Sequence, residues 1–574
     1  MPSAAAARPR LGSGLRIAAL SALRVGAGTP LRRAARRVRR RMLDQAADCK
    51  AVQARTLQRL LMLGKGSQWQ AGHGVRPGLS ARHLAETVGI TRYDDYAAAI
   101  DQMLAGNHRA MLGASQKVVM HALSSGTTGR TKHIPVSREF LTDYRRGWQA
   151  WGIGTFDTHR RLHTHNIFQM ASSHNRGSTP NGVPCGNISG LVQTMQSPVV
   201  RTMYSVPVAA LDVGDPQAKS YVALRAGLAD PRVAMAMAAN PSTLLQLAEL
   251  ALTRSDDLIR DLHDGTLAVD VPQALHRRLA RRHRARAKEL DRLAEAYGEL
   301  TPRLFWPKLS VLACWTGGSC AAYLPRLRRL YRDAEDRAIP IRDHGLSASE
   351  GRMTIPLEDE TASGLLDTQS HFFEFVPEDA IDQTDPPTRL AHELEVGQTY
   401  FILLTTSSGL VRYDIHDVVR CTGFVGTTPL LEFLHKGAHI ANITGEKITE
   451  SQVVHAVAAG CGASVFTVAP DWDATDTDAI PRYMLLLEPP AEVSLDRIDS
   501  ALRLANEEYD DKRASGRLGR LGMRELPAGT FAALARQRQS SVGGSAEQYK
   551  HPFLLPQLDA IDSLLALETD PVAV

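Results

Sequence analysis

The chain has few cysteines, and they are scattered along it. Six occur in 574 residues, without a C-x-x-C pair and without a Cys/His cluster at zinc-binding spacing. This excludes a disulfide framework and a structural zinc module. We expect reduced thiols, most of them small buried hydrophobes, in a cytoplasmic protein. The positions are Cys49, Cys185, Cys314, Cys320, Cys421 and Cys461.

Long apolar runs are also missing. No stretch reaches the roughly 18–20 residues that a membrane-spanning helix needs. Hydrophobic residues make up 44% and charged residues 22%, which excludes a collagen, a coiled coil and a wholly disordered chain. At about 150 residues per domain, this length allows two to four domains with a core that needs no covalent staple.

Negative charge is absent from the N-terminus. The first 41 residues hold eleven arginines and no acidic residue. Taking these charges from the net +6 leaves the rest of the chain at −5. The body is therefore mildly acidic, and nucleic acid is not an expected partner for it.

Residues 1–47 are rich in Ala, Arg, Gly and Pro, and the pattern of residues 31–42 is compatible with a basic helix. We expect an Arg-rich, disordered extension here, or a start assigned too far upstream. Two other interpretations stay open: a surface that contacts anionic lipid or nucleic acid, and a targeting peptide. A secretory signal is disfavoured because Ser21 and Arg24 interrupt the apolar stretch.

Strand-like and helix-like patterns alternate through the body, which predicts an α/β fold. A single, highly charged helix is expected over residues 269–297, and another helix over 323–337. The composition changes after residue 434. We predict a large α/β domain over 48–434 and a smaller α+β domain over 435–574.

A crowded polar loop follows the apolar strand predicted at residues 117–123. Residues 124–132 read S-S-G-T-T-G-R-T-K. Glycines let the backbone approach a polyphosphate, hydroxyl and N–H groups donate to its oxygens, and Lys132 adds positive charge. This is not a Walker A loop, because Thr131 stands where that motif has glycine. The predicted phosphate-binding residues are Ser124, Ser125, Gly126, Thr127, Thr128, Gly129 and Lys132.

This loop resembles the phosphate-binding signature of the adenylate-forming superfamily. Further segments narrow the resemblance to one branch, the auxin-responsive-promoter family of acyl-acid amido synthetases. The resemblance covers about residues 48–560, with its motifs in the expected order. The segments are C-W-T-G-G-S (314–319), S-A-S-E-G (347–351), F-F-E-F-V-P (372–377), the stretch 405–424, G-E-K-I-T-E (445–450) and Q-Y-K-x-P (548–552).

The resemblance implies a large N-terminal α/β adenylate-forming domain and a small, mobile C-terminal domain. It also implies an ATP- and Mg²⁺-dependent ligase. The carboxylate of a small acid would attack the α-phosphate of ATP and release pyrophosphate. An amine, an amino acid in this reading, would then take the acyl group. Two anions must be brought together, which requires hydrogen-bond donors and a metal ion.

The resemblance also implies roles for individual residues. Lys132, Glu350 and Lys550 are the catalytic candidates, and Lys550 would enter the site with the small domain. Glu350 is the Mg²⁺ ligand, since this ion prefers oxygen ligands. Asp417 would accept hydrogen bonds from the ribose hydroxyls, and Tyr323 would bind substrate. The remaining nucleotide-binding candidates are Gly318, Ser319, Ser349 and Arg420. Arg412, like Arg420, is a candidate for a phosphate or hinge contact.

One position departs from the family pattern. The family usually places an aromatic residue, commonly Tyr, a few residues before the glutamate, where it stacks on adenine. Leu346 occupies that position here, with His344 two residues earlier. Adenine would stack on an aliphatic face, or His344 would substitute.

Two alternatives remain open. An acyl-CoA ligase would use a thiol as acceptor, although the stretch 405–424 disfavours it. A catalytically silent homologue would bind nucleotide or an acyl ligand only. The acid, the amine and the oligomeric state are not readable from the sequence.

Overall fold

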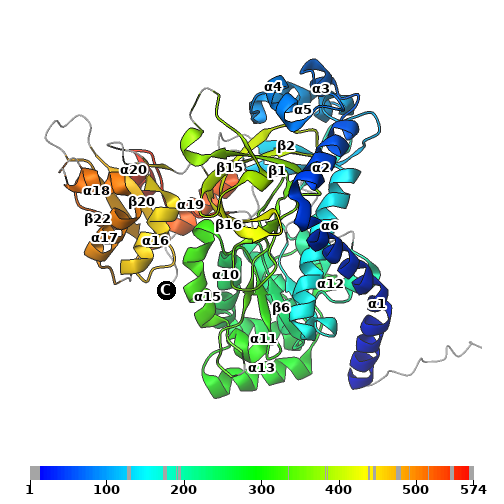
Figure 1. The fold of residues 1–574 in the computed structure, drawn as a ribbon. Helices are drawn as coiled ribbons and strands as arrows, with labels where there is room; N and C mark the ends of the chain where they lie inside the picture. The colour runs from blue at the N-terminus through cyan, green and yellow to red at the C-terminus, as the bar shows by residue number, and fades with distance from the viewer. Residues whose placement is uncertain are drawn as a thin grey trace, which may run out of the picture.

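The structure is a computed structural model. It describes residues 13–125, 131–171, 177–188, 190–191, 196–333, 335–381, 383, 385–436, 440–441, 443, 446, 448–472, 480–489, 492–514, 516, 518–542 and 549–567. A large body carries a smaller C-terminal domain on one side and a long N-terminal helix on the other (Figure 1). The expected two-domain α/β architecture is confirmed.

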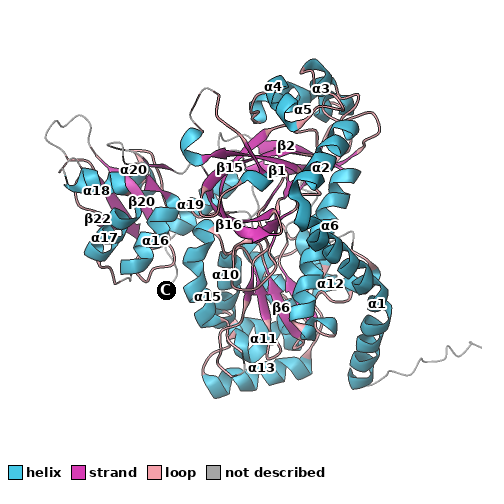
Figure 2. Ribbon diagram, viewed as in Figure 1, coloured by secondary structure: helices cyan, strands magenta, loops and turns pink. Residues whose placement is uncertain are grey.

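A parallel sheet forms the lower half of the body, with helices packed around it (Figure 2). Its order is β3-β6-β7-β8, and its strands are Asn166–Gln169, Val233–Met237, Val311–Ala313 and Ile341–Arg342. β6 and β7 are buried along their whole length, as expected for strands covered on both faces. Its helices are α9 (Pro216–Leu228), α10 (Pro241–Thr253), α11 (Ser255–Asp264), α12 (Gln273–Leu279), α13 (Arg284–Tyr297), α14 (Pro302–Phe305) and α15 (Leu324–Leu330).

Two further sheets form the upper half. The order β2-β1-β5-β4 joins Thr131–Ser137, Val118–Ser125, Pro184–Gly186 and Gly177–Ser178. A seven-stranded antiparallel sheet has the order β11-β12-β17-β16-β15-β13-β14. In chain order its strands are Thr354–Ile355, Gly364–Leu366, Phe372–Pro377, Arg389–Leu390, Thr399–Thr405, Tyr413–Val425 and Thr428–Lys436.

Helices α2 to α6 cover these upper sheets. α6 runs from Arg138 to Thr158, and Ser137 caps it by accepting a hydrogen bond from the Phe140 backbone N–H. The others are α2 (Cys49–Leu63), α3 (Gln68–Gly72), α4 (Ala81–Thr87) and α5 (Ala97–Leu104). Short 3₁₀ turns precede α5 at Tyr93–Tyr96 (η2) and α15 at Gly318–Tyr323 (η6).

The small domain is a three-stranded sheet covered by helices. Its order is β20-β21-β22, formed by Thr467–Asp471, Arg482–Leu487 and Gly522–Glu525. Its helices are α16 (Glu450–Gly460), α17 (Leu495–Ala505), α18 (Glu507–Ala514), α19 (Thr530–Val542) and α20 (Ala560–Leu565). Its apolar interior is continuous with that of the body, because one buried cluster includes Tyr323 and Phe553.

Two helix predictions were too long. The expected helix over 269–297 is broken into α12 and α13 at residues 280–283. The expected helix over 323–337 ends at Leu330, because Tyr331 adopts an extended backbone and buries its ring. In both cases packing against the body overrides the local helical pattern.

The prediction of a disordered N-terminal arm is wrong for Ser13–Gln45, which form the single helix α1. Arg24 is buried, and its guanidinium donates to the Thr202 backbone oxygen and, at 2.6 Å, to Asn166 Oδ1. Arg36 makes a bidentate ion pair with Asp157 of α6. Charge-assisted hydrogen bonds of this kind hold a polar helix that apolar packing alone would not.

All six cysteines are free and buried, which agrees with their interpretation as small core residues. Among the described residues, no helix combines the length and apolar character needed to cross a membrane.

Candidate functional site

The polar loop predicted to bind phosphate closes the β1–β2 hairpin. Ser124 pairs with Lys132 and Ser125 with Thr131 across this antiparallel ladder. Both serines therefore belong to the end of β1, directly before the loop. Gly126, Thr127, Thr128 and Gly129 lie outside the described residues.

Lys132 lies against an aromatic ring that the sequence did not single out. Its ammonium nitrogen is 5.4 Å from the centroid of the Tyr93 ring, within the range of a cation–π contact. The Tyr93 hydroxyl accepts a hydrogen bond from the His133 backbone N–H at 2.9 Å. Tyr93 therefore contacts both the side chain of the lysine and the backbone of the next residue. No motif pointed to Tyr93, because it comes from η2 and is remote in sequence.

The S-A-S-E-G segment forms the tight turn between two short strands, β9 (Ser347–Ala348) and β10 (Gly351–Arg352). Ser349 Oγ donates to the Leu123 backbone oxygen of β1 at 3.3 Å. This contact ties the turn to the base of the phosphate hairpin.

Glu350, at the same turn, is only 6% exposed. Its carboxylate is within electrostatic reach of two phenols. Burial raises the pKa of Tyr93, and nearby carboxylates including Glu350 add to the shift. Burial also raises the pKa of Tyr413, and Glu350 is the next contribution. The charge of the glutamate thus reaches Tyr93, whose ring contacts Lys132, and the three residues come from separate segments.

The C-W-T-G-G-S segment is held in place by a buried carboxylate. Asp343 Oδ2 accepts hydrogen bonds from the Thr316 backbone N–H at 2.5 Å and from its hydroxyl at 2.7 Å. Burial raises the pKa of Asp343 to about 6, against the effect of these hydrogen bonds. The Trp315 indole N–H donates to the Gly345 oxygen at 3.1 Å. These contacts fix the C-W-T-G-G-S segment relative to residues 343–345.

Gly318 adopts a left-handed backbone, with φ of 57°. A Cβ atom there would lie 2.6 Å from the Leu434 backbone oxygen. Glycine is required at this position because the backbone is left-handed and because a Cβ atom would not fit. The side chain of Ser319 is outside the described part of the chain.

Lys550 extends from the small domain to the C-W-T-G-G-S segment and β17. Its ammonium nitrogen lies 5.0 Å from the Trp315 ring and 5.7 Å from the Phe433 ring. The Asn240 amide donates to the neighbouring Tyr549 backbone oxygen at 3.0 Å. The segment carrying the predicted catalytic lysine therefore rests directly on the large domain.

Tyr323 lies at the same junction between the domains. Its ring is buried and makes an edge contact with Phe553, with centroids 5.8 Å apart. Its visible contacts are with the small domain, and a substrate role remains a prediction.

Asp417 is buried on β16 and pairs in register with Lys436 of β17. Phe433 and Leu434 of β17 contact the C-W-T-G-G-S segment. Asp417 is on β16, the strand that pairs with β17. Arg420 is on the same strand, but its guanidinium forms an ion pair with Glu432 at 2.8 Å. Its nucleotide role remains a prediction.

The Arg412 side chain makes its contacts inside the large domain. Its guanidinium pairs with Glu374 at 3.0 Å, with both side chains buried, and donates to the Val88 oxygen at 2.7 Å. It therefore ties the residue before β16 to β13 and to the C-terminal end of α4, and its suggested phosphate or hinge contact remains a prediction.

His344 does not offer a face for adenine. Its ring is buried and makes edge contacts with Trp148 and Trp151, at centroid distances of 5.6 and 5.5 Å. The suggestion that it substitutes for the family's aromatic residue is therefore wrong. Leu346 is only partly buried, so its aliphatic side chain is the surface left at that position.

The burial of His344 gives a pH-dependent prediction. Burial, with the charge of Arg352, lowers its pKa to about 3 from 6.5. The unfolded chain binds the extra proton below about pH 6.5, so stability falls as the pH drops from there toward 3. When the pH falls from about 7.5 to about 5.5, the free energy of unfolding of His344→Phe should decrease by about 1.4 kcal/mol less than that of the parent chain. Urea unfolding followed by tryptophan fluorescence measures this. An exposed histidine changed in His455→Gln should leave the parent's pH dependence intact, and equal slopes for all three chains would refute the assignment.

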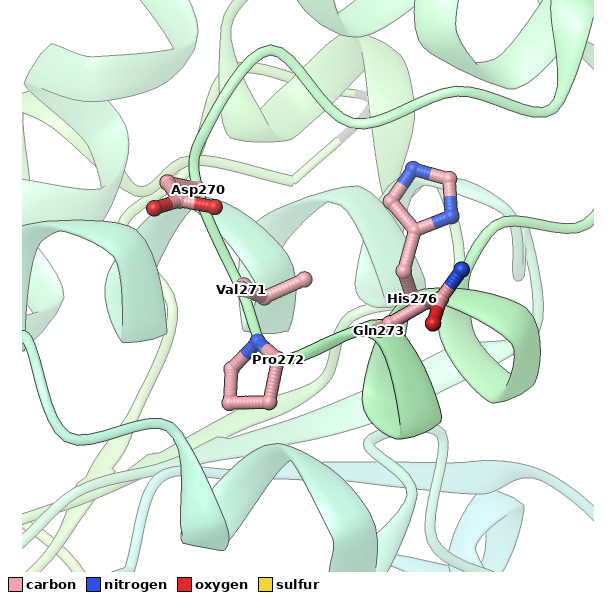
Figure 3. A pocket seen from close by; sticks show the side chains of 5 residues that line it. All are labelled: Asp270, Val271, Pro272, Gln273 and His276. Atoms are coloured by element: carbon pink, nitrogen blue, oxygen red, sulfur yellow. The ribbon is translucent and has the colours of Figure 1, made fainter.

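A surface hollow elsewhere on the body is not part of this arrangement. It has a volume of about 530 Å³ and is lined by Asp270, Val271, Pro272, Gln273 and His276 (Figure 3). The side chains of Asp270 and His276 stand on opposite sides of it. None of the predicted site residues lines it.

The comparisons with known proteins agree with these motifs. The model of the GH3 family N-terminal domain matches residues 38–335, that of the central domain 364–436, and that of the C-terminal domain 450–558. A rice protein named "Probable indole-3-acetic acid-amido synthetase GH3.2" is 25% identical over 88% of each chain. The rice "Jasmonoyl--L-amino acid synthetase GH3.5" is 24% identical over 90% of this chain and 94% of its own. The solved structure of "GH3.15 acyl acid amido synthetase" has a TM-score of 0.77 at 19% identity, covering 91% of this chain and 95% of its own. The resemblance found in the sequence is confirmed.

Proposed function

The chain belongs to the GH3 family, and on that premise we propose that it is an ATP-dependent acyl-acid amido synthetase. It activates a small carboxylic acid as an acyl-adenylate and passes the acyl group to an amine. One relative is named as a probable indole-3-acetic acid-amido synthetase and another as a jasmonoyl--L-amino acid synthetase, so an amino acid is the proposed acceptor.

One observation supports this proposal above the others. Lys550 of the small domain lies on Trp315, inside the segment whose Thr316 is fixed by Asp343. An enzyme that joins two anions needs a cation that can approach both reacting groups. A lysine carried on a separate domain provides that charge and can be withdrawn.

In the first half-reaction, a carboxylate oxygen of the acid bonds to the α-phosphorus of ATP, and the bond to pyrophosphate breaks. The β1–β2 hairpin and Lys132 hold the β- and γ-phosphates, and Asp417 accepts hydrogen bonds from the ribose hydroxyls. Lys550 balances charge between the carboxylate and the α-phosphate. In the second half-reaction the amine nitrogen bonds to the acyl carbon, AMP leaves, and the amine loses a proton.

Mg²⁺ fits the carboxylate of Glu350, which is buried at the turn beside the phosphate hairpin. Within the described residues no cluster of three potential ligands is present, but Mg²⁺ commonly binds through one carboxylate plus substrate phosphates. Glu350 is that carboxylate, at the turn tied to the phosphate hairpin. When bound, the ion neutralises charge on the phosphate oxygens.

The test is pyrophosphate release with ATP and Mg²⁺ from a panel of aryl, indolyl and fatty acids, with and without an amino-acid mixture. Release that depends on one acid, rises with one amine and yields an amide supports the proposal. Release that responds to CoA and not to amines favours the acyl-CoA ligase. No release with any acid, with thermal stabilisation by ATP, favours the silent homologue.

The contact between Tyr93 and Lys132 gives a mutational prediction. Tyr93→Leu removes the aromatic face and the hydroxyl, whereas Tyr93→Phe removes only the hydroxyl. Cation–π contacts contribute about 0.5–2 kcal/mol, so Tyr93→Leu should raise KM for ATP about 2- to 30-fold. Tyr93→Phe should have a smaller effect. Initial rates of pyrophosphate release against ATP concentration measure both.

A matched control is available on the surface. Tyr297 makes a cation–π contact with Arg303 at 5.9 Å and is exposed. Tyr297→Leu should leave KM for ATP unchanged. A Tyr93→Leu enzyme with parental KM would show that the ring does not position Lys132.

A further inference from the structure

Residues 343–345 join three separate segments of the proposed site. Their three backbone oxygens each accept a hydrogen bond from a side chain of another segment. In the order of these oxygens, the donors are the Trp151 indole N–H of α6 at 2.7 Å, the Arg352 guanidinium of β10 and the Trp315 indole N–H at 3.1 Å. Arg352 comes two residues after Glu350, and Lys550 lies on Trp315. The two groups proposed to act on the phosphates of ATP are therefore held to one three-residue segment.

Arg352 carries a fully buried charge. It is 1% exposed, and its guanidinium carbon lies 4.3 Å from the centroid of the Trp148 ring of α6, a cation–π contact. Burial lowers the pKa of Arg352 to about 10, so the group remains charged at neutral pH. Within the residues that the structure describes, its Nε and Nη1 atoms have no hydrogen-bond partner. A buried charge with so few partners costs stability, so packing alone would favour an apolar side chain here.

Helix α6 makes room for this side chain. A Cβ atom on Gly147 would lie 2.8 Å from the Arg352 Cδ atom. Glycine is less favourable than alanine inside a helix, yet any side chain at this position would displace the arginine. The same helix begins directly after β2 of the phosphate hairpin. The guanidinium therefore lies between α6, which continues from the hairpin, and the backbone of residue 344.

The turn that carries Glu350 is short, so its position follows that of Arg352. Both residues of β10 pair with β9. A Cβ atom on Gly351 would lie 2.2 Å from the His371 Nε2 atom, so the backbone after the glutamate is in close contact with that ring. A displacement of Arg352 would therefore displace Glu350 as well.

We propose that Arg352 is a positioning residue that holds the Glu350 turn in a fixed position relative to Trp315, on which Lys550 lies. It acts through the backbone oxygen of His344, because residues 343–345 also bind the C-W-T-G-G-S segment. The inference rests on the proposed function, in which Glu350 and Lys550 act on the same ATP. A charged donor strengthens the hydrogen bond to the carbonyl, and a shift of about 1 Å in a reacting group costs about 10²-fold in rate.

Hydrogen–deuterium exchange of the full-length protein tests this connection without relying on turnover. Arg352→Met keeps an unbranched side chain but removes the donor and the charge. Exchange should become at least about tenfold faster in peptides covering residues 343–353, because a charge-assisted hydrogen bond is lost. It should also become faster in residues 314–319, where the Thr316 N–H is bonded to Asp343. If Arg352→Met does not fold, Arg352→Lys, which keeps the charge on a single donor atom, is measured in the same way.

Arg286 of α13 provides the matched control. It is also buried, and it donates to the backbone oxygens of Leu228 and Phe305. Arg286→Met should leave exchange in residues 314–319 as it is in the parent. If exchange in the Arg352 variant changes only in residues 343–353, Arg352 serves local packing and the proposal is overturned.

Kinetics provide a second readout. Arg352→Met should lower kcat for acid-dependent pyrophosphate release about 10²-fold, whereas KM for ATP should change less than about threefold, because the effect is on the transition state. In the Lys550→Ala background the same substitution should cost less, since a group that is already absent cannot be displaced. Equal fold losses in both backgrounds would overturn the proposal. A parent enzyme that releases no pyrophosphate would refute the proposed function, and the exchange result would still decide whether Arg352 connects the two segments.

Discussion

Replacing Lys550 by alanine is expected to lower acid-dependent pyrophosphate release by about 10²–10³-fold, the cost of removing one preorganised charge from a reacting group. The Lys550 ammonium lies over Trp315 and beside Phe433, and its side chain is otherwise exposed. Its loss should therefore change the melting temperature little. KM for ATP should change less than kcat, because the charge acts on the transition state.

Two comparisons make the Lys550 result interpretable. Lys550→Arg keeps the charge but replaces a compact ammonium by a planar group, so it should recover part of the rate. Lys288, exposed on α13, is the matched control, and Lys288→Ala should behave like the parent. If Lys550→Ala retains more than about half of the parental release, Lys550 does not act in the adenylation step. Amide formation from added acyl-adenylate would then show whether it acts in the second step.

The sequence predicted those parts of the site that are continuous in the chain. The loop after β1, the S-A-S-E-G turn and the C-W-T-G-G-S segment each carry glycine and hydroxyl residues at fixed spacing. The structure connects two of them directly, through the hydrogen bond from Ser349 to Leu123. Short-range patterns of this kind encode turns and backbone approach, and they can be read without knowing the fold.

Contacts between distant segments were not predictable in this way. Tyr93 and Lys132 are neighbours only because η2 packs against the β1–β2 hairpin. Arg412 was a candidate for a phosphate or hinge contact because it is an arginine in a motif, and the structure shows that it pairs with the buried Glu374. His344 was assigned to adenine by sequence position, and two tryptophans of α6 enclose it. In each case the deciding partner comes from another part of the chain.

In the N-terminal arm, disorder was predicted where the structure has a helix. Its composition is typical of disorder, because Arg, Gly and Pro bury little apolar surface. The helix forms because buried carbonyl, amide and hydroxyl groups of the body receive Arg24 and because Asp157 receives Arg36. Acceptors on another segment stabilise a helix that its own sequence would leave marginal.

Glu350→Gln is the second substitution with a large expected effect. Glutamine keeps the shape of the side chain but removes the charge that would bind Mg²⁺. The Mg²⁺ concentration for half-maximal pyrophosphate release should rise at least about tenfold, and the maximal rate should fall about 10²-fold, because several kcal/mol of charge stabilisation is lost. Thermal stability should be unchanged or higher, since a buried carboxylate is replaced by a neutral group.

Titration of Mg²⁺ at saturating ATP distinguishes metal binding from simple damage to the site. Glu350→Asp keeps a carboxylate on a shorter side chain and should show an intermediate Mg²⁺ requirement. Glu358, exposed a few residues along the same segment, provides the control, and Glu358→Gln should titrate like the parent. A Glu350→Gln enzyme with a lower rate but an unchanged Mg²⁺ midpoint would remove Glu350 from the metal site. Its carboxylate would then act through Tyr93, whose phenol its charge reaches and whose ring contacts Lys132 of the phosphate hairpin.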